Sequence, residues 1–247
     1  MIELLLSYKQ MNRQTLKTLE NCYKQHSLGA GNPQEVDLST SWQPELLPDR
    51  CLRSVGREQA AQGNYTEAIA LLSHLIDRHP DNAIDYNNRG LVYFQSGQLL
   101  SAIADYDKAI RLDPQLASAY NNRANFYAAK GHLSVALFDY DRALDLNPSY
   151  VRGWINRGIT LRDLKRYEEA IENLDFALYL GQLQANIYAE RGRTYHLWGD
   201  WNLAIADYGR ALTYIERHQV PNSAVDYTRL RLQVDTWLAQ LLRPLSS

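Results

Sequence analysis

Five alanines recur at a fixed interval along this chain, and this spacing constrains the fold more than any other feature. Each stands 34 residues after the one before: Ala68, Ala102, Ala136, Ala170 and Ala204. A period of this length is typical of one supersecondary unit copied in series, in which each copy is too small to bury its own apolar face. The chain of 247 residues is therefore expected to grow by stacking such units and not around one central core.

Other positions with the same period predict that each unit is a pair of helices. A small residue stands twelve positions before each alanine, which lets two helices approach closely: Gly56, Gly90, Ala124, Gly158 and Gly192. Prolines end the first three units, because a missing N–H and a fixed φ stop a helix: Pro80, Pro114 and Pro148. Glycines stand midway, where one helix must end and turn: Gly63, Gly97, Gly131 and Gly199.

The unit resembles the tetratricopeptide repeat, a 34-residue helix–turn–helix. One segment, 83–116, carries the pattern most fully: Tyr86, Gly90, Tyr93, Gly97, Ala102, Tyr106, Ala109 and Pro114. The resemblance implies an all-α fold, a right-handed superhelical α-solenoid of five helical hairpins in which the first helices line a concave groove. The five repeats are 49–82, 83–116, 117–150, 151–184 and 185–218. Departures from the pattern occur in the first, fourth and fifth repeats: Leu75, Lys165, Gln182 and Glu216.

Three regions frame the repeats at 49–218. Residues 1–27 carry apolar residues at helical intervals and predict an N-terminal amphipathic helix. Residues 28–48 are broken by Gly and Pro and predict a linker. Residues 219–247 predict a helix that covers the open face of the last repeat, followed by a tail. Apolar linker residues either lie in the groove or cover the first repeat, and we favour the second interpretation: Val36, Leu38, Trp42, Leu46 and Leu47.

Composition narrows the classes of function. A net charge of −2 and a pI near 6.3 give no overall attraction to a phosphate backbone, so nucleic acid is not an expected partner. Most tyrosines occupy repeat positions that pack helices. The two cysteines, Cys22 and Cys51, lack metal-ligand spacing and predict reduced thiols in a cytoplasmic protein. No apolar run is long enough for membrane insertion, although a membrane-protein client stays compatible.

Chemistry-bearing residues form no catalytic pattern. The six histidines show neither an i, i+4 pair nor the carboxylate companions of a metal site, and no nucleophile has a base in register. We therefore expect no enzyme activity, no cofactor and no metal.

Asparagines predict a peptide-binding surface. The sixth position of successive repeats holds Ser54, Asn88, Asn122, Asn156 and Glu190. An amide both donates and accepts hydrogen bonds, so a row of amides can hold the backbone of an extended peptide. Local capping or pairing is an equally good interpretation of each asparagine taken alone. Some tetratricopeptide proteins hold peptide backbones with a similar row.

Arginines add to this surface. Arg53 and Arg57 partly match a clamp for a terminal carboxylate that some family members carry, whereas solvated arginines are the simpler interpretation. Arg152, Arg162 and Arg193 break the period and are candidates for specificity. The predicted concave-face site comprises Arg53, Arg57, Asn87, Asn88, Asn121, Asn122, Asn125, Arg152, Asn156 and Arg193. A periodic set predicts inter-helix ion pairs with Asp105, Asp139 and Asp207: Arg89, Arg123, Arg157 and Arg191.

Together these features predict a scaffold or adaptor that binds a segment of another protein, extended or helical, in the groove, for example as an assembly factor. The alternative is a structural subunit that associates with itself or with a larger complex through its terminal helices. The Tyr-Asn-Asn-Arg-Gly run at 86–90 resembles repeats of bacterial, especially cyanobacterial, proteins, some of which assist assembly of membrane complexes.

Overall fold

The computed structural model describes residues 11–27, 47–218 and 227–242, and within these ranges every regular element is a helix. The repeats supply ten of these helices. They are α3 (Asp49–Ala61), α4 (Tyr65–Arg78), α5 (Ala83–Gln95), α6 (Leu99–Leu112), α7 (Ala117–Ala129), α8 (Leu133–Leu146), α9 (Val151–Asp163), α10 (Tyr167–Tyr179), α11 (Gln184–Trp198) and α12 (Trp201–His218). The predicted all-α fold is confirmed.

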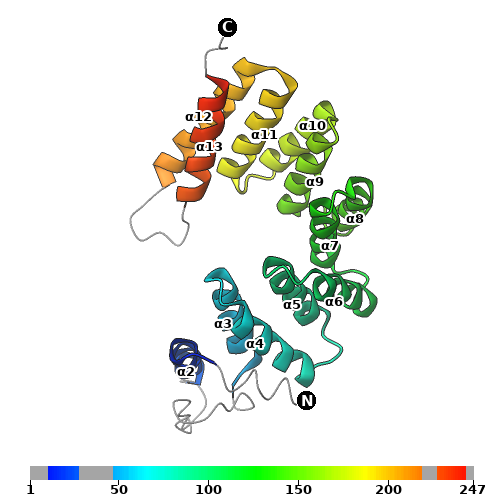
Figure 1. Ribbon diagram of the computed structural model, residues 1–247, viewed down its shortest axis with the longest axis vertical. Coiled ribbons are helices and arrows are strands. Elements are labelled where there is room, and N and C mark those ends of the chain that lie inside the picture. Colours follow the sequence, from blue (N-terminus) through cyan, green and yellow to red (C-terminus); the bar gives the residue numbers. More distant parts are fainter. Residues whose placement is uncertain (1–10, 28–46, 219–226, 243–247) are drawn as a thin grey trace. The chain divides into compact units, whose positions relative to one another are not determined.

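The chain divides into two compact units, residues 1–126 and 127–247, with the boundary inside α7. In the first unit α3 packs against α4 and α5 against α6, and in the second α9 packs against α10 and α11 against α12. Figure 1 shows these pairs as neighbouring antiparallel ribbons. Each unit has its own apolar core, so the chain is not built around one central hydrophobic core.

Close approach within a hairpin depends on the periodic small residues. A Cβ added to Gly90 would lie 2.9 Å from the ring of Tyr106, and one added to Gly192 would lie 2.8 Å from the ring of Tyr208. Both tyrosines are fully buried. The missing side chain therefore leaves room for an aromatic ring from the second helix of the same hairpin.

The turns between paired helices use the left-handed backbone region. Four turn glycines have positive φ values of 82°, 80°, 79° and 96°: Gly63, Gly97, Gly131 and Gly199. A left-handed residue of this kind commonly ends an α-helix. The fourth repeat has Lys165 at the same place with a φ of 61°. A non-glycine residue is therefore held in a conformation that costs free energy.

The last repeat helix is longer than its counterparts. The helix α12 contains 18 residues, whereas α4, α6 and α8 contain 14 each. Glu216 stands where the first three repeats have proline, so nothing in the backbone stops the helix there. The helix continues to His218 and gains a further turn.

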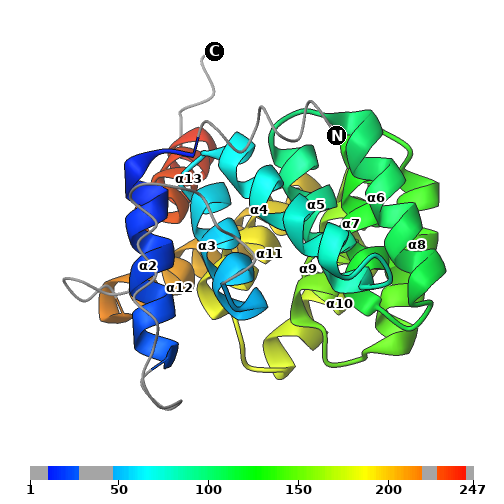
Figure 2. The same cartoon turned by 90° about the horizontal axis from the view of Figure 1, so that it is seen from below.

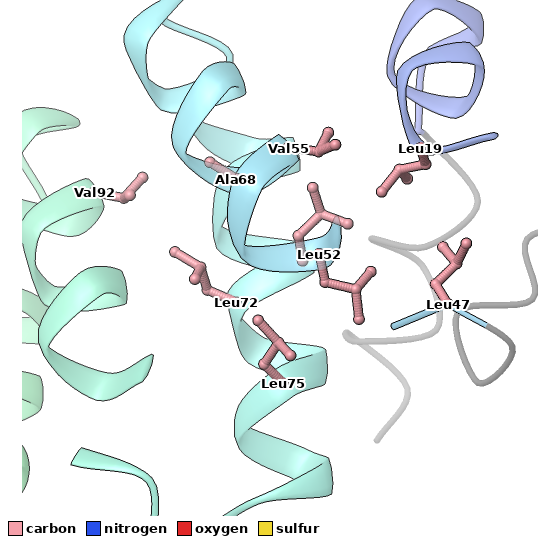
Figure 3. Close-up of a cluster of buried hydrophobic side chains, with 9 residues drawn as sticks. Leu19, Leu47, Leu52, Val55, Ala68, Leu72, Leu75 and Val92 are labelled. Carbon is pink, nitrogen blue, oxygen red and sulfur yellow. The ribbon is translucent and has the colours of Figure 1, made fainter. Parts of the chain in front are cut away.

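An N-terminal helix, α2 (Arg13–Ser27), packs against α3. Figure 2 shows the two helices side by side. Leu19 of α2 is fully buried with Leu47 against Leu52 and other apolar residues of the first repeat, as Figure 3 shows. Arg78 fixes the same corner by donating from Nη1 to the carbonyl oxygen of Leu47 at 2.9 Å. Leu47 thus covers the first repeat. The other four apolar linker residues lie outside the described residues.

The two cysteines correct the sequence-based prediction. Cys22 of α2 and Cys51 of α3 form a disulfide, with Cα atoms 5.8 Å apart. The prediction of reduced thiols was wrong because residues 29 positions apart in sequence meet when α2 packs on α3. The expected cytoplasmic location rested on reduced thiols, and the disulfide removes that support.

At the other end, α13 (Thr228–Leu241) covers the fifth repeat. Its Val234 is fully buried against Ala189 of α11 and against Tyr208 and Ala211 of α12. The guanidinium of Arg193 lies 5.4 Å from the ring centroid of Trp237 on α13. The apolar face that a sixth repeat would cover is therefore closed by this helix.

Candidate functional site

The periodic arginines join neighbouring hairpins. Arg89 donates from Nε and Nη2 to the carboxylate of Asp105 at 2.8 and 2.9 Å, and from Nη1 to Ser73 Oγ at 3.0 Å. Asp105 belongs to the same hairpin as Arg89, whereas Ser73 belongs to the preceding one. Burial lowers the pKa of Arg89, but the hydrogen bonds and charge of Asp105 outweigh it and raise the pKa overall. The guanidinium therefore stays charged while it joins two repeats.

The same arrangement recurs in the fifth repeat. Arg191 binds Asp207 of its own hairpin through Nε at 2.6 Å and also donates to Asp175 of the preceding hairpin. The predicted inter-helix pairs are thus confirmed for Arg89 with Asp105 and for Arg191 with Asp207.

For the other two arginines, the structure shows contacts with the preceding hairpin that the sequence analysis missed. Arg123 binds Asp107 at 2.8 Å, and Arg157 binds Asp141 at 2.7 Å and Asn173 of its own hairpin at 2.9 Å. A signal for these contacts was present, because Asp107, Asp141 and Asp175 also recur every 34 residues.

The asparagines divide into two groups by burial. Asn87 and Asn121 are only 5% and 2% exposed, whereas Asn88 and Asn122 are half-buried. Asn122 donates from Nδ2 to Asn87 Oδ1 at 3.0 Å, which joins the second and third repeats. Asn87 in turn donates to Ser118 Oγ at 3.5 Å. Asn87 therefore joins two repeats, whereas Asn121 donates to Asn122 of its own repeat at 3.4 Å. The sixth position lies nearer to solvent.

The two arginines of the first repeat have different surroundings. Arg53 donates from Nε and Nη2 to both oxygens of the buried Asp85, each at 2.7 Å, and the bond to Asp85 raises its pKa. Arg57 is exposed and makes no ion pair with another described residue. The structure thus ties Arg53 to the second repeat and leaves Arg57 as the accessible cation of the pair.

In the second unit the predicted residues are also unequal. Arg152 is exposed at the first turn of α9, and Asn156 is half-buried one turn later. Arg193 donates to Gln240 of α13 at 3.3 Å, so the terminal helix covers it. Arg162 is mostly buried and donates to Glu190 at 2.6 Å, which joins the fourth and fifth repeats. Asn125 is half-buried on α7 in the first unit.

The described part of the chain contains neither a membrane-spanning helix nor a cluster of metal ligands. Among the described residues, no helix is both long and apolar enough to cross a membrane. In the same part of the chain, no group of three or more His, Cys, Asp or Glu side chains comes together as a metal site would require.

Family comparisons agree with this geometry. Models described as TPR repeat match residues 56–97 and 90–131, and models described as tetratricopeptide repeat match residues 117–150 and 139–172. The chain is a tetratricopeptide repeat protein. As such a protein it is a scaffold for protein–protein interaction in general, and the tetratricopeptide fold is typically non-catalytic. No curated protein matches the chain.

Solved structures share the tetratricopeptide fold at low sequence identity. A thermophilic tetratricopeptide repeat protein of Thermus thermophilus is 21% identical, with a TM-score of 0.66 over 78% of this chain and 100% of its own. One from Parabacteroides merdae is 20% identical, with a TM-score of 0.62 over 97% of this chain and 84% of its own. MamA from Desulfovibrio magneticus is 15% identical, with a TM-score of 0.57 over 70% and 97%. At these identities the likeness shows the fold alone.

Proposed function

We propose that the protein captures an extended segment of a partner protein along the first helices of its repeats, as an adaptor or assembly factor. The observation that carries the proposal is Asn88. Its side chain is half-buried on α5 and makes no hydrogen bond with another described residue. An amide in this position presents a donor and an acceptor together, which is what a peptide backbone needs. The interaction fold of the family supports the same function.

Neighbouring residues extend this surface within the first unit. Asn122 uses its Nδ2 on Asn87 at 3.0 Å, so its side chain is oriented before any ligand arrives. A fixed side chain loses less conformational entropy on binding than a free one. Arg57, exposed on α3, adds a cation that can meet a carboxylate of the ligand. Arg152 and Asn156 give the second unit a similar pair on α9.

The test compares two kinds of asparagine. A partner is first identified by affinity capture from the native host, and overlapping synthetic peptides then locate the bound segment. We expect the double variant Asn88→Ala, Asn122→Ala to bind this segment about 5- to 150-fold more weakly, because each of the two lost hydrogen bonds costs about 0.5–1.5 kcal/mol. Binding is measured by isothermal titration calorimetry, with circular dichroism to show unchanged helicity.

A matched control comes from Asn202, which is exposed at the start of α12. Asn202→Ala removes the same group from a second helix and is expected to bind the segment like the parent protein. Unchanged affinity in the double variant would show that the asparagines do not hold the partner.

A structural role through the terminal helices is the second candidate. It is favoured by Leu232 and Leu242 of the C-terminal region, which are 68% and 61% exposed. On this alternative, the full chain forms concentration-dependent oligomers that are lost on deleting residues 1–48 or 223–247. Sedimentation velocity of the full chain and of both truncations decides, since a full chain that stays monomeric at all concentrations excludes self-association.

A further inference from the structure

A cavity of about 670 Å³ lies beside α12 and the first turns of α11, within the second unit. Its lining includes Gln184 and Tyr188 of α11 and Arg210, Arg217 and His218 of α12. None of these residues belongs to the predicted groove, which is built from other positions of the first helices. The cavity is therefore a separate feature of the fifth repeat.

The extra turn of α12 contributes two residues, Arg217 and His218, to the lining of the cavity. The helices α4, α6 and α8 end at Arg78, Leu112 and Leu146, each shortly before a proline. Because Glu216 replaces that proline, α12 continues and carries Arg217 and His218 past the end that the other repeats have. Both residues line the cavity together with Gln184 of α11.

Two arginines, Arg210 and Arg217, line the cavity. Arg217 is exposed and makes no hydrogen bond or ion pair with another residue of the described ranges. Arg210 contacts Asp207 at 2.6 Å, but that carboxylate is 1% exposed and already binds Arg191. The other acid nearby on α12, Glu216, faces Arg231 of α13 at 3.5 Å. Arg217 thus has no carboxylate partner within the described ranges, and Arg210 shares Asp207 with Arg191.

The remaining lining suits a peptide chain. An added Cβ at Gly209 would have no atom within 4 Å, so a ligand backbone can approach the helix there. Thr213 and Gln184 add a hydroxyl and an amide to the lining. His218 donates from Nδ1 to the carbonyl oxygen of Tyr214 at 2.8 Å, and the two rings stack with centroids 4.0 Å apart. The ring atom left for a ligand is Nε2.

We propose that this cavity binds an acidic peptide segment, whose carboxylates pair with Arg210 and Arg217. The two arginines are seven residues apart on one face of α12, which separates them by about 10 Å along the helix. In an extended, polyproline-type peptide, side chains three residues apart face the same way at about 9 Å. Two carboxylates at this spacing can each pair with one of the two arginines. The site does not depend on the groove proposed above.

The test uses a fluorescein-labelled hexaglutamate peptide and the full chain. Fluorescence anisotropy is expected to show binding that weakens as salt is raised, and no binding of the hexaglutamine counterpart. Arg217→Gln is expected to weaken hexaglutamate binding about tenfold, because it removes a charge-assisted hydrogen bond. In NMR spectra of the labelled protein, the peptide is expected to shift the amides of Gly209 and Thr213.

A matched control is Arg111→Gln, the same change at an exposed arginine of α6 that lines no part of this cavity. It is expected to bind hexaglutamate like the parent chain, and circular dichroism checks the fold of both variants. Equal weakening in the two variants, or amide shifts away from α12, would overturn the proposal. So would binding of inorganic phosphate at Gly209 and Thr213 without binding of the peptide.

Discussion

Individual glycines decide how closely the helices of a hairpin pack. In the fifth repeat, Gly192 has the ring of Tyr208 2.8 Å from where its Cβ would stand. Gly209, on the second helix of the same hairpin, is exposed and has open space around it. Both positions are glycine, but one is tightly packed and the other is open. The same substitution at each therefore distinguishes the effect of packing from the effect of helix propensity.

We predict that Gly192→Ala lowers the free energy of unfolding by about 1–3 kcal/mol, because a buried ring must move. Gly209→Ala is predicted to raise the free energy of unfolding by about 0.5–1 kcal/mol, because alanine favours the helix and meets no neighbour. Urea denaturation of both variants measures the difference. If Gly209→Ala destabilises the protein, the space around Gly209 is not open as the structure shows.

A single histidine gives a pH dependence of known sign. Burial, followed by the charge of Arg193, lowers the pKa of His196 in the folded protein below its ordinary value. Near pH 6 the unfolded chain then binds more protons than the folded one, so stability is full above the ordinary pKa and falls as pH falls. We predict a smaller loss of stability between pH 7.5 and pH 5 in His196→Gln than in the parent. Equal losses in urea denaturation at the two pH values would count against this assignment.

At the scale of elements, helix α2 is attached to the first repeat by both packing and a covalent bond. Leu19 is fully buried against the repeat, and Cys22 is joined to Cys51. The bond closes a stretch of 29 residues, which restricts the unfolded chain. The apolar contacts of Leu19 and the hydrogen bond from Asn12 to Glu67 do not involve the disulfide, so we expect them to persist when the bond is reduced.

We predict that reduction lowers the stability of the protein by about 2–4 kcal/mol without unfolding the repeats. Thermal unfolding with and without dithiothreitol measures the change. Cys22→Ala already lacks the bond and is expected to show no response to the reductant. A parent protein that also shows none would mean that the two cysteines are not joined in solution.

At the scale of the whole molecule, the chain consists of repeats that contact mainly their neighbours. The core around Leu52 belongs to the first unit, and the cores around Leu174 and Tyr208 belong to the second. Stability in such an array is approximately a sum of local terms. A loss of stability in one repeat is therefore expected to affect mainly that repeat and its immediate neighbours.

We predict that Gly192→Ala speeds amide hydrogen exchange in α11, α12 and α13 and leaves α3 to α6 unchanged. Exchange followed by mass spectrometry resolves these helices. A uniform increase along the chain would show that the molecule opens as one cooperative unit instead.

The fold followed from the sequence because its signals are local and repeated. Each signal acts within one hairpin and recurs in the other repeats; examples are Gly97 at the turn, Ala102 in the packing and Pro114 at the end. The candidate site was harder to predict. Asn87 and Asn88 are adjacent in sequence, and only packing against the third repeat makes one a buried bridge and leaves the other accessible.

By itself, then, the sequence determined the helical hairpins, their turns and the family, because backbone preference and periodic packing depend on residues close along the chain. Only the tertiary structure decided which polar side chains are used up internally, as Arg53 is by Asp85. It also joined Cys22 to Cys51 and placed Arg217 and Gln184 in the lining of one cavity. These residues are about 30 positions apart in the sequence. The repeat period alone does not predict which helix surfaces pack against each other.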